Sequence, residues 1–146
     1  MARIRIEMPE NYLFSTEIPV RISDINYGGH LGNDSVLSIL HEARVRFLKH
    51  YHYTEMDIEG ASLIMADNAV IYKAEGFYGD SIQVDVAVGD FNKYGCDIYY
   101  LLTNKETAVE MAHAKTGVVF FDYDERKIRP VPEQFRTQML KVTSGG

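Results

Sequence analysis

Acidic, amide, histidine and glycine residues gather in one short stretch, SDINYGGHLGNDSVL, which spans residues 23–37. The carboxylate of Asp24 and the imidazole of His30 are groups that accept or donate protons, the imidazole near neutral pH. Three glycine residues loosen the backbone into a turn, and an apolar run begins at Val36. A flexible polar turn that leads directly into a buried helix is a place where an enzyme could hold and protonate a substrate.

The apolar run after this turn predicts a helix over residues 34–50. Asn33 or Asp34 can cap the helix by accepting hydrogen bonds from its free N–H groups. Arg44 lies within the apolar face, so we expect it to pair with a carboxylate. At a spacing of 3.6 residues, the apolar face consists of Val36, Leu37, Leu40, Ala43, Phe47 and Leu48.

Alternation of apolar and polar residues predicts strands on both sides of the helix. Residues 15–23 alternate as a first strand, in which Ile18, Val20 and Ile22 point the same way. After the helix the segments are rich in Val, Ile, Tyr and Phe and are separated by Gly, Asp or Asn turns. The four strands expected there span residues 62–75, 80–91, 94–104 and 108–124.

The order of these elements predicts one α+β domain over residues 1–146, with consecutive antiparallel strands in a single five- or six-stranded sheet. Prolines end the last strand, and a short helix is expected from Pro132 or Glu133. One helix cannot cover both faces of such a sheet, and an open edge invites pairing. We therefore expect a homo-oligomer, either a dimer or a tetramer.

Composition excludes several classes of function. The chain has 15 Lys and Arg against 21 Asp and Glu, a net charge of −6, which argues against nucleic-acid binding. No apolar run is long enough for a membrane span, and the amino-terminal residues do not resemble a signal peptide. Cys96 is the single cysteine, and the histidines lack metal-ligand spacing, so we expect no disulfide, no metal and a cytoplasmic location.

Three segments together resemble a known enzyme family. RISDINYGGHLGNDSVLSILHEARVRFL, residues 21–48, is similar to the opening of the 4-hydroxybenzoyl-CoA thioesterase and acyl-CoA thioesterase family, including the E-A-R of its helix. FYGDSIQVDVAV, residues 77–88, is similar to its third-strand signature, and AHAKTGVVFFDYDERKIRPVP to its last strand and exit. The resemblance implies the hotdog fold, in which a curved antiparallel sheet wraps one long central helix.

The resemblance also implies a function and a site. It implies hydrolysis of a small or medium acyl-CoA at a dimer interface, with coenzyme A as part of the substrate and no separate cofactor. By alignment on the glycine before His30, the oxyanion donor of the family is the backbone N–H of Asn33, at a helix end whose dipole favours negative charge. Gly29 and Gly32 are expected to border the substrate, which approaches the backbone closely there.

The catalytic carboxylate of the family falls on Asn26, whose amide cannot accept a proton. Three interpretations stay open at this stage. In the first, Asp24 acts as the base while Asn26 orients the water. In the second, Asp67 of a partner subunit supplies the carboxylate. In the third, the protein binds acyl-CoA without hydrolysing it. A salt bridge between Asp24 and Arg44 would be a purely structural use of that acid.

Two further predictions concern ligands and rival activities. A hydratase on the same fold would place its histidine five residues after the acid, whereas Asp24 and His30 are six apart, so this activity ranks below hydrolysis. Phosphates of coenzyme A call for basic residues near the cleft. The candidates are Lys73, Lys93, Lys105, Lys115 and Arg126.

Overall fold

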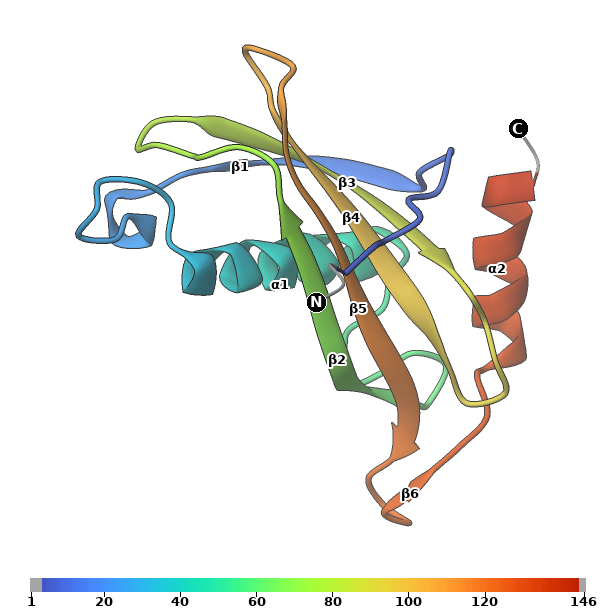
Figure 1. The fold of residues 1–146 in the computed structure, drawn as a ribbon. Coiled ribbons are helices and arrows are strands. Elements are labelled where there is room, and N and C mark those ends of the chain that lie inside the picture. Colours follow the sequence, from blue (N-terminus) through green and yellow to red (C-terminus); the bar gives the residue numbers. More distant parts are fainter. Residues whose placement is uncertain (1–3, 145–146) are drawn as a thin grey trace.

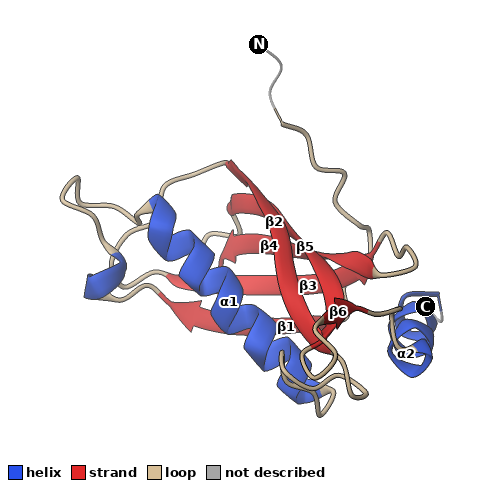
Figure 2. Cartoon of the chain, turned by 90° about the horizontal axis from the view of Figure 1, so that it is seen from below, coloured by secondary structure: helices blue, strands red, loops and turns tan. Residues whose placement is uncertain are grey.

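The computed structural model describes residues 4–144 and contains a curved antiparallel sheet, a long helix across one face, and a second helix beside it (Figures 1 and 2). The sheet order is β1-β3-β4-β5-β2, and β6 pairs with β5. This confirms the predicted α+β architecture. The strands are β1 (Phe14–Pro19), β2 (Ser62–Tyr72), β3 (Ser81–Gly89), β4 (Gly95–Asn104), β5 (Glu110–Asp122) and β6 (Lys127–Ile128); the helices are α1 (Asn33–His50) and α2 (Glu133–Ser144).

Alternation along the strands builds the core face of the sheet. Val86 on β3 lies opposite Tyr100 on β4, which lies opposite Ala114 on β5, and all three are fully buried. The neighbouring row ends in Ala112, also buried, so small side chains line β5 where α1 crosses this face. Burial of apolar surface between the helix and this face is the main stabilising contribution to the fold.

The predicted apolar face of α1 is correct at every position except Leu37. Leu37 is 45% exposed, whereas Ile39 is 4% exposed and packs in the core instead. Leu37 lies at the edge of the apolar face of α1, which is centred on Leu40 and Ala43, and the sheet does not cover the helix at that edge. The helix therefore carries Leu37 on its outer surface, together with Val45, which is 42% exposed.

The first strand is shorter than predicted. It ends at Pro19, and residues Ile22–Asp24 form one turn of 3₁₀ helix, which leaves Ile22 69% exposed. The carboxylate of Asp24 accepts a hydrogen bond from the backbone N–H of Arg21 at 2.8 Å. This local bond closes the turn and competes with continuation of the strand, which alternation alone does not reveal.

Helix α2 begins at Glu133, as predicted, and buries Phe135 and Met139 against the core. Phe135 is 1% exposed and contacts the rings of Tyr53, Phe91 and Phe120, with centroids 5.5–6.3 Å apart. Such tilted and edge-on ring pairs are favourable beyond their buried area. The cluster anchors the carboxyl-terminal helix at a distance from the amino-terminal end of α1 (Figure 1).

Arg44 pairs with a carboxylate as expected, but the partner is Glu55 and not Asp24. Its Nε donates to Glu55 at 2.9 Å, and its terminal nitrogen donates to the hydroxyl of Tyr100 at 3.0 Å. His41 contacts the other oxygen of Glu55 at 2.9 Å. The guanidinium thus ties α1 to the loop before β2 and to β4, and its buried charge has an anionic partner.

We expect Glu55→Gln to lower the free energy of unfolding by about 2–3 kcal/mol at neutral pH, because Arg44 would lose its anionic partner. Burial raises the pKa of Glu55, but the hydrogen bonds and charges of Arg44 and His41 outweigh it, so the pKa lies below its ordinary value of 4.5. Stability from this group is therefore complete above pH 4.5 and is lost as pH falls below it.

Urea unfolding of the native protein and of Glu55→Gln between pH 3 and 7 measures both effects. The difference in the free energy of unfolding between the native protein and Glu55→Gln should become smaller as the pH is lowered. Glu42→Gln is the matched control, because Glu42 forms an exposed pair with Arg46 on the same helix. A difference of the same size at every pH would contradict the assigned ionic contribution.

Candidate active site

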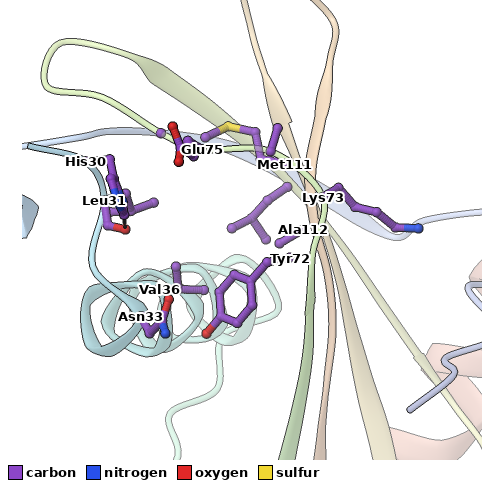
Figure 3. A pocket seen from close by; sticks show the side chains of 12 residues that line it. His30, Leu31, Asn33, Val36, Tyr72, Lys73, Glu75, Met111 and Ala112 are labelled. Carbon is purple, nitrogen blue, oxygen red and sulfur yellow. Dashed lines mark hydrogen bonds between the residues drawn. The ribbon is translucent and has the colours of Figure 1, made fainter. Parts of the chain in front are cut away.

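A pocket of about 390 Å³ opens at the amino-terminal end of α1 (Figure 3). Its walls come from the turn before α1, the first turn of α1, the end of β2 with the loop after it, β4 and β5. The size lies in the range of small-molecule sites. The apolar lining comprises Leu31, Val36, Leu102, Met111 and Ala112, and the polar lining comprises His30, Asn33, Tyr72, Lys73 and Glu75.

The first N–H groups of α1 lie at this pocket without an acceptor. Gly32 is the N-cap residue in an extended conformation, and Asn33 is the first helical residue. Within residues 4–144, no hydrogen bond is formed by the backbone N–H of Asn33. The prediction that Asn33 or Asp34 caps the helix was wrong, because no side chain accepts from these groups. The helix end is therefore free to bind an oxygen atom that carries negative charge.

A short backbone connection holds the two sides of the pocket together. The N–H of Leu31 donates to the carbonyl of Gly76 at 2.7 Å, and the N–H groups of Lys73 and Ala74 both donate to the carbonyl of Met111. A Cβ atom at Gly76 would lie 2.8 Å from Met111 and 3.2 Å from Leu31. The terminal methyl group of Met111 can shift, but the contact with Leu31 leaves little room for a side chain at this position.

Asn26 organises the turn and does not line the pocket. Its side-chain oxygen accepts hydrogen bonds from the backbone N–H groups of Gly28 at 2.9 Å and His30 at 3.4 Å. Gly29 follows with a φ of 86°, a conformation that favours glycine. Asn26 and Gly29 thereby bring His30 to the pocket while they themselves stay on the outside of the turn.

Asp24 is buried and faces a different cavity. Its carboxylate accepts from the backbone and guanidinium of Arg21, and its backbone carbonyl accepts from the N–H of Gly32 at 3.0 Å. That cavity is lined by Glu42 and Arg46 as well as by Asp24. Asp24 therefore holds Arg21 with its carboxylate and the N-cap residue of α1 with its backbone carbonyl, and the alternative salt bridge with Arg44 was wrong.

The remaining predicted residues lie away from the pocket. Asp67 is exposed on β2, next to a bulge, and accepts from the N–H of Gly117 at 3.1 Å. Cys96 is buried in β4, and burial raises the pKa of its thiol to about 12, which fits a structural role. Of the five basic candidates only Lys73 lines the pocket, and Figure 3 shows its side chain directed away from the other labelled residues.

Two polar residues of the pocket were not among those singled out from the sequence. Tyr72 ends β2, and its ring lies beside Asn33 and Val36 (Figure 3). Glu75 follows in the loop after β2. In the sequence both belong to the segment predicted as a strand, whose alternation of apolar and polar residues does not mark a site. The one signal for a site there was the carboxylate of Glu75 close to the next turn.

Within residues 4–144, no group of three or more His, Cys, Asp or Glu residues is placed to hold a metal ion. Over the same residues, no helix has the length and apolar character needed to cross a bilayer.

Comparison with known proteins identifies the family of the chain. The family model of the Thioesterase-like superfamily matches residues 20–139. The chain belongs to this superfamily. Curated proteins yielded no match.

Solved structures with the same fold include thioesterases. The 1,4-dihydroxy-2-naphthoyl-CoA thioesterase Slr0204 from Synechocystis has a TM-score of 0.79 and 23% identity, over 87% of this chain and 95% of that one. A thioesterase superfamily protein from Jannaschia sp. CCS1 has a TM-score of 0.82 and 20% identity, over 92% of this chain and 86% of that one. At these identities the likeness establishes the hotdog fold that the sequence resemblance predicted.

We expect Gly76→Ala to lower the free energy of unfolding by about 1–3 kcal/mol, because the new methyl group would press on Leu31 and Met111. Thermal and urea unfolding measure this change. Ala74→Ser, at an exposed neighbouring position of the same loop, should stay within about 0.5 kcal/mol of the native protein. Equal stability of Gly76→Ala and the native protein would show that the loop does not need its close approach to the turn.

Proposed function

We propose that this protein is an acyl-CoA thioesterase that hydrolyses small or medium acyl groups. The observation that carries the proposal is the unpaired N–H of Asn33, which lies at an apolar pocket at the positive end of α1. Attack on a thioester carbonyl places negative charge on its oxygen, and donors that are already oriented stabilise that charge. Membership of the superfamily supports this choice of reaction.

In this proposal the acyl group occupies the apolar part of the pocket. Leu31, Val36, Leu102 and Ala112 give it a fixed apolar wall, and Met111 adds a flexible side chain that adapts to different acyl shapes. The carbonyl oxygen accepts from the N–H of Asn33, while a carboxylate removes a proton from the attacking water. His30 lies at the rim, where its Nδ1–H donates to the backbone carbonyl of Leu31 at 3.4 Å, which leaves Nε2 of the neutral ring as an acceptor for water or substrate.

Dimerisation through β2 is part of the proposal. Strand β2 is an edge of the sheet and pairs only with β5 within the described chain. Its central residues 66–68 are exposed, and Tyr72 at its end is 49% exposed beside the pocket. Antiparallel pairing of β2 with its copy would satisfy the open edge and bring a second subunit to the pocket.

Replacement of Asn33 tests the oxyanion site directly. Asn33→Pro removes the N–H at the first helical position, where proline fits the backbone and the preceding Gly32 is already extended. We expect kcat/KM for acyl-CoA hydrolysis to fall about 10²- to 10³-fold. Thiol release from short, medium, long and aromatic acyl-CoA esters provides the assay.

Asn33→Ala is the matched control, because it keeps the N–H and removes only the side chain. Its rate should stay within a few fold of the native rate, and both variants should keep the thermal stability of the native protein. If Asn33→Pro were as active as Asn33→Ala, the helix end would not be the oxyanion site. If the native protein bound acyl-CoA but released no thiol from any ester, it would be a binding protein.

The open edge at β2 leads to a prediction of the oligomeric state. We expect sedimentation equilibrium to give twice or four times the chain mass of 16.7 kDa. Lysine substitution at Ala66, an exposed residue of the edge strand, should shift the mass toward the monomer because like charges would face each other across the twofold axis. A monomeric native protein at micromolar concentration would contradict the proposed β2 interface.

A further inference from the structure

The proposed hydrolysis needs a carboxylate near the thioester. The residues that the sequence offered for this role are bound to other groups or cannot accept a proton. Asp24 lines another cavity and is bound by Arg21. Asn26 is an amide whose oxygen is bound to the backbone of the turn. Asp67 is bound to the backbone of Gly117 in the middle of the sheet.

Two other acids lie near this end of α1 without reaching the pocket. Asp34 is exposed in the first turn of the helix, and its carboxylate is directed back over Gly32, where a Cβ atom would lie 2.8 Å from it. Glu42 pairs with Arg46 on the flank of α1. Neither lines the pocket that holds Asn33.

Glu75 is the one carboxylate in the lining of this pocket, among the residues that the structure describes. No hydrogen bond or ion pair of its side chain is found within residues 4–144, and the residue is exposed to solvent at the rim. A carboxylate in this state can take a proton from water without first breaking another interaction. Figure 3 shows Glu75 on the loop after β2, His30 and Leu31 on the turn before α1, and Asn33 at the start of the helix.

The backbone on both sides of Glu75 is fixed. Ala74 donates to Met111 on β5, and Gly76 accepts from Leu31, two residues before Asn33. The same backbone bond therefore positions the carboxylate and the N–H of the oxyanion site relative to each other. Groups held this way need little rearrangement when a substrate binds between them.

We infer that Glu75 is the general base of the reaction, an assignment that rests on the proposed thioesterase function. The carboxylate of Glu75 accepts a proton from water as the water oxygen bonds to the thioester carbon. The carbonyl oxygen becomes an oxyanion at the N–H of Asn33. The C–S bond then breaks, Glu75 returns its proton to the departing sulfur, and the products are a carboxylate, coenzyme A and the proton that the new acid releases.

The experiment compares Glu75→Gln with Asp24→Asn on the best ester of the acyl-CoA panel. Glu75→Gln keeps the size and polarity of the side chain but cannot accept the proton, so kcat should fall about 10²- to 10⁴-fold. Binding of a non-hydrolysable acyl-CoA thioether, measured by calorimetry, should change less than about threefold. Asp24→Asn, which can still accept from the backbone of Arg21, should keep kcat within about threefold.

The outcomes distinguish a failure of the assignment of Glu75 from a failure of the proposed thioesterase function. Loss of kcat in Glu75→Gln with intact thioether binding, together with an active Asp24→Asn, supports the assignment. An active Glu75→Gln, or collapse of kcat in Asp24→Asn alone, would overturn it while the thioesterase function stands. A native protein that hydrolyses none of the esters would overturn the function and the assignment together.

Glu75→Asp adds a readout that a purely structural role would not produce. It keeps a carboxylate about one methylene farther from the water, so its kcat should lie between those of the native protein and Glu75→Gln. Equal losses in Glu75→Asp and Glu75→Gln, accompanied by weaker thioether binding in both, would indicate that Glu75 shapes the pocket and is not the base.

Discussion

The backbone hydrogen bond from Leu31 to Gly76 joins the two parts of the chain on which the site depends. Leu31 belongs to the turn that leads into α1, and Gly76 to the loop that leaves β2. The bond places the free N–H groups of the helix beside the apolar end of the sheet. Without it the helix end and the pocket wall could move apart, and neither would form a site alone.

The rest of the fold keeps α1 in the register that this bond requires. Arg44 contacts Glu55 before β2 and Tyr100 on β4, and Thr116 on β5 donates to Asn68 on β2 at 2.7 Å. A hydrophobic face alone tolerates small rotations and shifts of a helix, whereas a buried guanidinium keeps its hydrogen bonds in few positions. The polar contacts in the core thus fix the helix along its axis, and the turn fixes its beginning.

The turn that resembles the catalytic turn of the family has a mainly architectural part in this chain. The side-chain oxygens of Asp24 and Asn26 both accept hydrogen bonds from backbone N–H groups, and these bonds shape the path from β1 to α1. That shape delivers His30 and Asn33 to the pocket. Among the described residues no such bond holds the carboxylate of Glu75, which is the acid that we propose as the base.

The sequence by itself determined the order of the elements, the apolar face of α1 apart from Leu37, and the pairing of Arg44 with a carboxylate, because these depend on local periodicity and on charge. Tertiary structure decided which acids reach the pocket. Glu75 lies more than forty residues after Asn33 in the chain, and only sheet pairing and the close approach at Gly76 bring them to one cavity. The partner of Arg44 was likewise a choice among acids that no local pattern distinguishes, since packing determines which one shares its buried environment.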